Sequence, residues 1–106
     1  MSKYYLVLST IDSTKTAENI AHRIVEERLA ACVNIIPDIT SVHKWEGELE
    51  HTMESLLVIK STQECLPRLI DRIKELHPYE LPEVIALPGE GGHPAYLNWI
   101  ASSTSG

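Results

Sequence analysis

The sequence predicts an α+β domain in which helices cover one face of a single sheet. Short aliphatic runs that are typical of strands alternate with two stretches whose apolar residues recur at helical spacing. Proline, glycine and aspartate separate these stretches from one another. The predicted order is strand, helix, strand, strand, helix, strand, and a short helix closes the chain.

The first strand is expected over residues 3–10 and should be central and buried, because Tyr4-Tyr5-Leu6-Val7-Leu8 is apolar on both faces. Asp12-Ser13-Thr14 follows as a cluster of helix-capping residues. An amphipathic helix of about four turns comes next. Its apolar stripe consists of Ala17, Ile20, Ala21, Ile24, Val25 and Leu29.

Residues 31–61 predict a long, bent hairpin. We expect a strand over 31–36 that resumes over 39–45, and a third strand from about 49 to 61. Glu46-Gly47 provides a tight turn between them. Because Pro37 cannot donate a ladder hydrogen bond, the strand must bulge or bend there, or lie at a sheet edge.

A second amphipathic helix is expected between residues 62 and 76. Its apolar stripe consists of Leu66, Leu69, Ile70, Ile73 and Leu76. Pro67 fits only a first helical turn, so the regular helix should begin late, near Glu64, or be bent at its start. His77-Pro78 should end it, since a residue before proline avoids the helical region.

The remainder of the chain predicts three short segments and a tail. A fourth strand is expected over 83–87, a glycine-rich loop over 89–92 and a closing helix over 93–101. The Ser- and Thr-rich residues 102–106 should be frayed.

This order of elements defines a split βαβ, or ferredoxin-like, arrangement. Both long helices should cover one face of the sheet, which leaves the other face open. Leu6 to Leu8 and Leu56 to Ile59 are nevertheless apolar on both faces. Because a monomer rarely exposes so large an apolar face, the sequence predicts an oligomer that buries it.

The composition limits the classes of function. The 106 residues fit one domain, 1–106, and no apolar run approaches the roughly 20 residues that a membrane helix needs. We see no signal peptide, so we expect a cytoplasmic protein with Cys32 and Cys65 reduced. A net charge of −6 argues against nucleic-acid and anionic membrane partners and mildly favours cations.

The sequence contains no pattern that predicts a conventional active site, so we expect no enzyme. Cys32 lies among apolar strand residues, where an inert thiol is the default, and Cys65 has no obvious partner base. The loop Gly89-Glu90-Gly91-Gly92 matches neither phosphate-binding pattern, and its glutamate opposes an anion.

The clearest candidate site is the segment His77-Pro78-Tyr79-Glu80-Leu81-Pro82-Glu83. It places an imidazole, a phenol and carboxylates between two prolines that stiffen the chain. Two interpretations stay open. The segment forms a ligand pocket or subunit junction, or it is a stiff connector whose polar groups satisfy one another.

The hairpin supplies further candidates. His43 and His51 lie opposite each other in one register, where they could hold copper or zinc weakly; a slip of one residue moves them to opposite faces. A solvated hairpin is the alternative. Trp45, at the hairpin tip, suits an interface anchor, since tryptophan is enriched at such positions.

Taken together, these segments resemble the CutA family of divalent-cation tolerance proteins, from about residue 5 to residue 100. The resemblance is carried by Arg28-Leu29-Ala30-Ala31-Cys32-Val33-Asn34-Ile35-Ile36-Pro37, Ile39-Thr40-Ser41-Val42, Trp45-Glu46-Gly47, Ile59-Lys60, the segment from His77 to Glu83, and Tyr96-Leu97-Asn98-Trp99.

The resemblance implies a ferredoxin-like fold assembled as a homotrimer, an association with tolerance of copper and other divalent cations, and no established catalytic activity. It implies that His77 and Glu83 contribute to a metal site for Cu(II) or another divalent cation. Tyr79 and Glu80 are expected in the same cleft between subunits. No particular protein partner is implied.

The chain departs from the family pattern at two places. Some bacterial members have a metal-binding cysteine where this chain has Ser9, and some have a second histidine where it has Leu76. Losing a soft thiolate and an imidazole should weaken a copper site. Two other functions compete with metal binding: a small-molecule sensor, by analogy with the trimeric PII proteins, and a scaffold for a protein partner.

Overall fold

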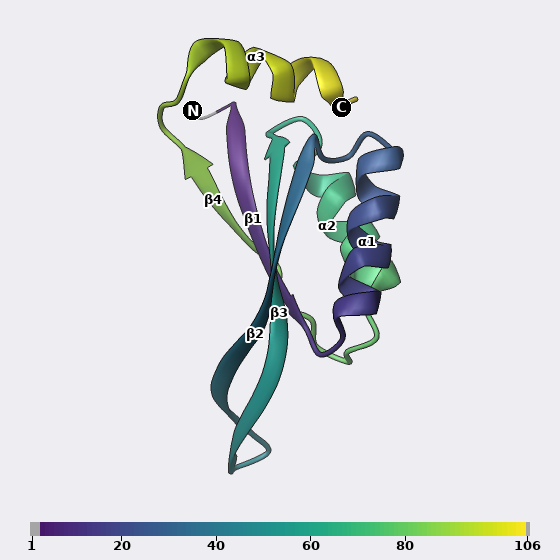
Figure 1. Cartoon of the computed structure of the whole chain (residues 1–106), viewed down its shortest axis with the longest axis vertical. Helices are drawn as coiled ribbons and strands as arrows, with labels where there is room; N and C mark the ends of the chain where they lie inside the picture. The colour runs from purple at the N-terminus through teal and green to yellow at the C-terminus, as the bar shows by residue number, and fades with distance from the viewer. Residues whose placement is uncertain (1–2, 106) are drawn as a thin grey trace.

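The computed structural model describes residues 3–105, which form four strands and three helices (Figure 1). In chain order the elements are β1 (Tyr4–Ile11), α1 (Thr14–Glu26), β2 (Cys32–Trp45), β3 (Glu48–Thr62), α2 (Leu66–Leu76), β4 (Ile85–Gly89) and α3 (Pro94–Ser103). The strands form one sheet in the order β2-β3-β1-β4, with every neighbouring pair antiparallel. This α+β arrangement is the predicted ferredoxin-like order.

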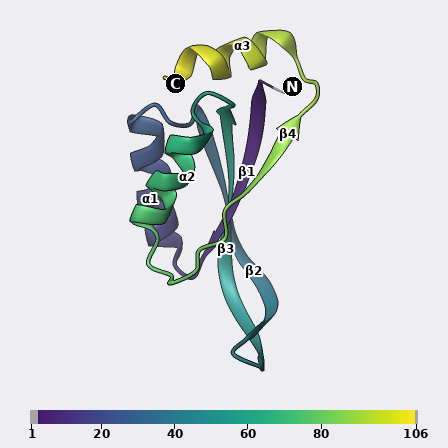
Figure 2. The same cartoon turned by 180° about the vertical axis from the view of Figure 1, so that it is seen from behind.

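Both long helices lie on one face of the sheet, as predicted, and α3 crosses one end of it (Figures 1 and 2). The buried core lies between α1, α2 and the central strands β1 and β3. Its members are Val7, Ile11, Ala17, Ile20, Ile24, Leu29, Ala30, Leu57, Ile59, Leu69 and Ile73. The predicted cap of α1 is present, because the Ser13 hydroxyl accepts a hydrogen bond from the Thr16 amide at 3.3 Å.

The hairpin of β2 and β3 projects beyond the rest of the domain (Figure 1). With the hairpin included, the chain measures 44 × 25 × 23 Å along its principal axes. Its register shifts between Ile36 and Ile39, around Pro37, and Asp38 takes a positive φ of 59°. Because β2 is an edge strand, the missing proline donor breaks no ladder bond. The predicted bend and edge position are therefore both confirmed.

Several predicted boundaries were wrong. Helix α1 ends at Glu26 instead of Leu29, because Arg28 takes a φ of 62° and turns Leu29 back into the core. Helix α2 begins at Leu66, two residues later than expected. Strand β4 covers Ile85–Gly89 instead of 83–87, because it pairs with β1 only from Ile85 onward.

The predicted fraying of residues 102–106 is also wrong where the structure describes them. Ser102 and Ser103 continue α3, and the Ser105 amide donates to the Arg28 carbonyl at 2.9 Å. The Arg28 guanidinium donates to the Ser102 carbonyl at 3.0 Å, and Arg68 bonds the Ser105 carbonyl. These bonds hold the tail against the end of α1; Gly106 lies outside the described residues.

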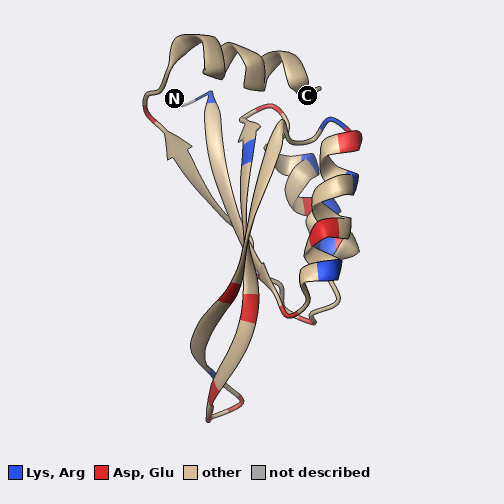
Figure 3. Cartoon of the chain, in the orientation of Figure 1, with Lys and Arg blue, Asp and Glu red and all other residues tan. Residues whose placement is uncertain are grey.

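The face of the sheet opposite the helices stays open and apolar. The register places Leu6, Ile36, Ile85 and Leu87 on this face, and 39–53% of each is exposed. Charged side chains instead concentrate on α1, α2 and the hairpin (Figure 3). The sequence-based expectation of an uncovered apolar face is confirmed for the single chain.

We expect alanine substitutions at two neighbouring residues of α1 to differ sharply in their effect on stability, because only one of the two side chains is buried. Ile24 is 0% exposed and Val25 is 37% exposed. Ile24→Ala should lower the free energy of unfolding by about 2–5 kcal/mol through lost packing and a residual cavity. Val25→Ala should change it by no more than about 0.5 kcal/mol. Denaturant titration at one protein concentration measures both; equal losses would contradict this assignment of the core.

Candidate functional site

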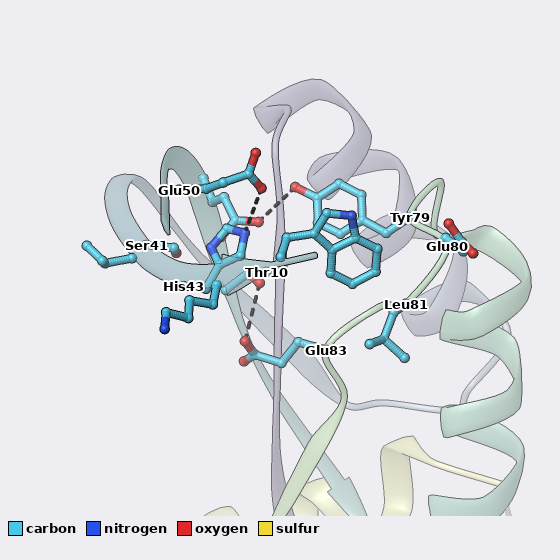
Figure 4. Close-up of a pocket in the computed structure, with 12 residues that line it drawn as sticks. Thr10, Ser41, His43, Glu50, Tyr79, Glu80, Leu81 and Glu83 are labelled. Carbon is cyan, nitrogen blue, oxygen red and sulfur yellow. Dashed lines mark hydrogen bonds and ion pairs between the residues drawn. The ribbon is translucent and has the colours of Figure 1, made fainter. Parts of the chain in front are cut away.

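A cleft of about 840 Å³ lies between the hairpin and the segment that joins α2 to β4 (Figure 4). Its lining residues come from three separate parts of the chain. They are Thr10, Ser41, Val42, His43, Lys44, Trp45, Glu50, Glu54, Tyr79, Glu80, Leu81 and Glu83. The predicted residues Trp45, Tyr79, Glu80 and Glu83 therefore share one site.

The floor of the cleft holds a carboxylate and a phenol. The Tyr79 hydroxyl donates to Glu54 Oε2 at 2.7 Å, and only 7% of Glu54 is exposed. Burial of the phenol raises the pKa of Tyr79, and its hydrogen bond and proximity to the Glu54 carboxylate raise it further. Tyr79 therefore stays protonated and remains a donor at neutral pH.

Glu83 ties the connecting segment to the end of β1. Thr10 Oγ1 donates to Glu83 Oε1 at 3.4 Å, as the dashed line in Figure 4 marks. Glu83 precedes β4, and its side chain lines the cleft. No residue that the structure describes donates a hydrogen bond to its second carboxylate oxygen.

His77 lies beneath the cleft instead of in its wall, and 7% of it is exposed. Nε2 lies 2.8 Å from the Thr10 carbonyl, which can only accept, and Nδ1 lies 3.1 Å from the Tyr79 amide, which can only donate. These bonds define the neutral tautomer protonated at Nε2. Both ring nitrogens of the predicted ligand His77 are therefore engaged within the chain, and the imidazole positions Tyr79.

The register decides the question that the sequence left open for the hairpin histidines. His51 pairs with Val42 and His43 pairs with Glu50, so the two imidazoles lie on opposite faces. Of the two registers that the sequence allowed, the hairpin has the one that separates His43 from His51. Instead, His43 Nε2 lies 3.5 Å from Glu50 Oε1 at the cleft (Figure 4).

The segment from His77 to Glu83 fits both interpretations that its sequence allowed. Its polar groups satisfy one another, as the His77 and Tyr79 bonds show, and its side chains also line a cleft. His77 and Tyr79 also pack edge to face, with ring centroids 4.5 Å apart.

The positions that distinguish this chain from some family members contain no metal ligands. Ser9 is 2% exposed, and its Oγ forms no hydrogen bond with any residue that the structure describes. It shares the helix-facing side of β1 with Val7 and Ile11, and Leu76 packs against the same core. Among residues 3–105, no three His, Cys, Asp or Glu side chains converge closely enough to hold a metal ion.

Sequence reasoning missed Thr10 and Glu54, the two residues that bond to the connecting segment. Glu54 carried a usable signal, because a carboxylate directly before the apolar run Ser55-Leu56-Leu57-Val58-Ile59 should be partly buried. Thr10 carried none, since a threonine at a strand end is common on solvated surfaces.

Two cysteines and the aromatic side chains of α3 complete the candidate residues. Cys65 is buried and Cys32 half-buried, and both are free thiols. Lys60 Nζ lies 3.8 Å from Cys32 Sγ. In α3, Trp99 is 45% exposed and packs beside Tyr96, with ring centroids 5.5 Å apart. No helix within residues 3–105 is long and apolar enough to cross a membrane.

The fold and cleft define a small α+β protein with a ferredoxin-like sheet and a cleft lined by several glutamates. Comparison with known sequences specifies the family: the chain matches the family described as CutA1 divalent ion tolerance protein over residues 5–103. The chain belongs to this family.

Individual relatives agree with this assignment. A divalent-cation tolerance protein CutA from Thermus thermophilus is 48% identical over 99 residues, which cover 93% of this chain and 96% of that protein. The mouse Protein CutA is 47% identical over 90% of this chain, which spans only 54% of that longer protein.

Solved structures show the same fold. The Thermus thermophilus protein has a TM-score of 0.94 at 46% identity, covering 96% of this chain and 99% of its own. A protein from Archaeoglobus fulgidus, described as a periplasmic divalent cation tolerance protein, has a TM-score of 0.91 at 37% identity. The match covers 94% of this chain and 97% of that one.

We expect Tyr79→Phe to weaken the domain by leaving the Glu54 carboxylate without its donor. The free energy of unfolding at pH 7 should fall by about 1–3 kcal/mol, as measured by denaturant titration. Tyr96→Phe is the control, because Tyr96 is 42% exposed and its hydroxyl bonds to none of the described residues. Equal stability of Tyr79→Phe and wild type would contradict the role of this bond.

The raised pKa of Tyr79 also predicts a pH dependence. Its contribution to stability should be complete below about pH 10, the ordinary phenol value, and should be lost as the pH rises through the higher pKa of the folded state. Absorbance titration of wild type minus Tyr79→Phe isolates the Tyr79 phenolate. A midpoint at or below about 10 would show that the phenol is not protected.

Proposed function

We propose that the protein is a homotrimer that binds divalent cations, Cu(II) foremost, and that it contributes to tolerance of metal ions. Membership of the CutA1 divalent ion tolerance family supports the general function. The observation that supports binding is the cleft, in which His43 and Glu50 place an imidazole and a carboxylate 3.5 Å apart among further glutamates.

The His43–Glu50 pair offers two donors that suit copper or zinc. Zinc bonds to nitrogen and oxygen ligands are about 2.0–2.2 Å long, so donor atoms 3.5 Å apart can share one ion with little movement. Glu83 lines the same cleft, and only one of its carboxylate oxygens accepts a hydrogen bond from the described residues. Because two donors from one chain hold an ion only weakly, water or a neighbouring subunit would supply the remaining ligands.

The trimer accounts for the open apolar face of the sheet. Leu6, Ile36, Ile85 and Leu87 would be buried when sheets from different subunits pack together. Strands β2 and β4 both lie at sheet edges with unpaired backbone groups, so they also offer pairing between subunits. Strand β2 is one arm of the hairpin beside the cleft, so such pairing would place the cleft at a subunit junction.

Two free cysteines fit a reducing compartment, which supports a cytoplasmic location. Not all relatives share that location, since the Archaeoglobus protein is described as periplasmic.

A second candidate function is sensing of a small molecule. The cleft of about 840 Å³ supports it, because this volume lies in the range of roughly 300–1,000 Å³ that is typical of sites for organic ligands and far exceeds the needs of one ion.

We expect light scattering and native mass spectrometry to give a mass of about three times the 11.9 kDa chain, with a fixed number of Cu(II) ions taken up per trimer. His43→Ala should weaken Cu(II) binding about tenfold, a loss of about 1.4 kcal/mol. His51→Ala is the matched control, because its side chain lies on the opposite face of the hairpin. A monomer would refute the assembly, and equal effects of the two substitutions would remove His43 from the site.

A further inference from the structure

Glu54 is a nearly buried carboxylate without a cationic partner. Only 7% of the residue is exposed, and its one hydrogen bond, to Oε2, comes from the neutral Tyr79 phenol. None of the ion pairs within residues 3–105 includes Glu54. Burying a carboxylate is costly unless a charge compensates it, so this group favours a cation from outside the chain.

The second oxygen of Glu54 is directed to the cleft. No residue that the structure describes donates a hydrogen bond to Oε1, yet this atom is not among the buried polar atoms that lack a partner. It therefore retains contact with solvent, and Glu54 lines the cleft beside the hairpin. The cleft thus has an acceptor on its floor whose natural complement is an N–H donor.

The net charge of the cleft is negative. Glu50, Glu54, Glu80 and Glu83 line it against the single cation Lys44, which leaves a formal charge of −3 with His43 neutral. Carboxylates around a partly enclosed space reinforce one another's field and attract cations. The same field repels phosphate and carboxylate ligands, so it favours an organic cation over a nucleotide.

One wall of the cleft is apolar. Trp45, Val42 and Leu81 line it, and they remain 40%, 58% and 72% exposed respectively. A metal ion would gain nothing from this wall, and no three ligand side chains converge among the described residues to hold one. An organic cation can use both features, because its apolar body packs on the wall and indole is the best aromatic partner for a cationic head.

We propose that the cleft binds an organic ammonium ion, with its N–H groups donating to Glu54 Oε1 and its apolar body on Trp45 and Leu81. This inference rests on the second candidate function, small-molecule sensing, and names its ligand class. It differs in position from the metal proposal, since the His43–Glu50 pair is half exposed whereas Glu54 is on the floor.

Three probes that share one apolar body test the proposal on the full-length protein: benzylammonium, benzyl alcohol and benzoate. Titrations contain EDTA, so that no divalent metal contributes. Because the chain has two tryptophans, Trp99→Phe isolates the fluorescence of Trp45. We expect saturable binding of benzylammonium at least about tenfold tighter than benzyl alcohol, and no binding of benzoate. Equal affinities for the three probes, or no binding of any, would overturn the proposal.

Charge variants of the lining give effects of opposite sign. Glu54→Gln keeps an acceptor for Tyr79 but removes the charge, and it should weaken benzylammonium binding about tenfold or more. Glu83→Gln, at a less buried position, should weaken it several-fold, whereas Lys44→Gln should strengthen it. If Glu54→Gln fails to fold, the opposite shifts in the other two variants still test the proposal. Unchanged affinity in both would overturn it.

The metal and ammonium proposals fail independently. Copper uptake that depends on His43, without benzylammonium binding, would overturn the ammonium site alone. Benzylammonium binding that depends on Glu54, in a protein that takes up no copper, would support the ammonium site and leave small-molecule sensing as the function.

Discussion

The imidazole of His77 connects the end of the first strand to the segment that forms the cleft. Its Nε2 donates to the Thr10 carbonyl and its Nδ1 accepts from the Tyr79 amide, and the bond to Thr10 spans 67 residues of the chain. Because the ring is buried, neither bond competes with water. The Tyr79 hydroxyl then reaches Glu54 on the hairpin. One side chain therefore fixes the relative placement of β1, the connecting segment and β3.

The cleft combines features that are unfavourable in an isolated chain. It has a buried carboxylate without a counter-ion, and it adjoins an open sheet face with exposed Ile36 and Leu87. A buried charge and an exposed apolar surface both carry a cost that an external partner can remove. The two features call for different partners, a cation for the cleft and an apolar surface for the sheet. The surface that calls for a ligand and the surface that calls for a protein partner are therefore different parts of one molecule.

The sequence predicted the order of the elements because apolar periodicity records local geometry. The stripes of α1 and α2, the break at Pro37 and the capping role of Ser13 all depend on neighbours within a few residues. The errors fall where contacts between distant segments set the result. Strand β4 begins at Ile85 because pairing with β1 selects that residue, and the tail is ordered because Arg28 bonds its carbonyls.

For the cleft, too, the sequence indicated the local features, whereas contacts between distant segments decided the rest. The chain alone indicated that the segment from His77 to Glu83 is a stiff polar element, because composition and proline spacing express rigidity and charge locally. Which atoms meet was a matter of register and of long-range packing. In the observed register, His43 lies opposite Glu50; a shift of one residue would have placed it opposite His51. Folding also brings Glu54 within hydrogen-bond distance of the Tyr79 hydroxyl. Hydrogen bonds between groups far apart in the chain leave no local pattern, so they became visible only once the sheet was assembled.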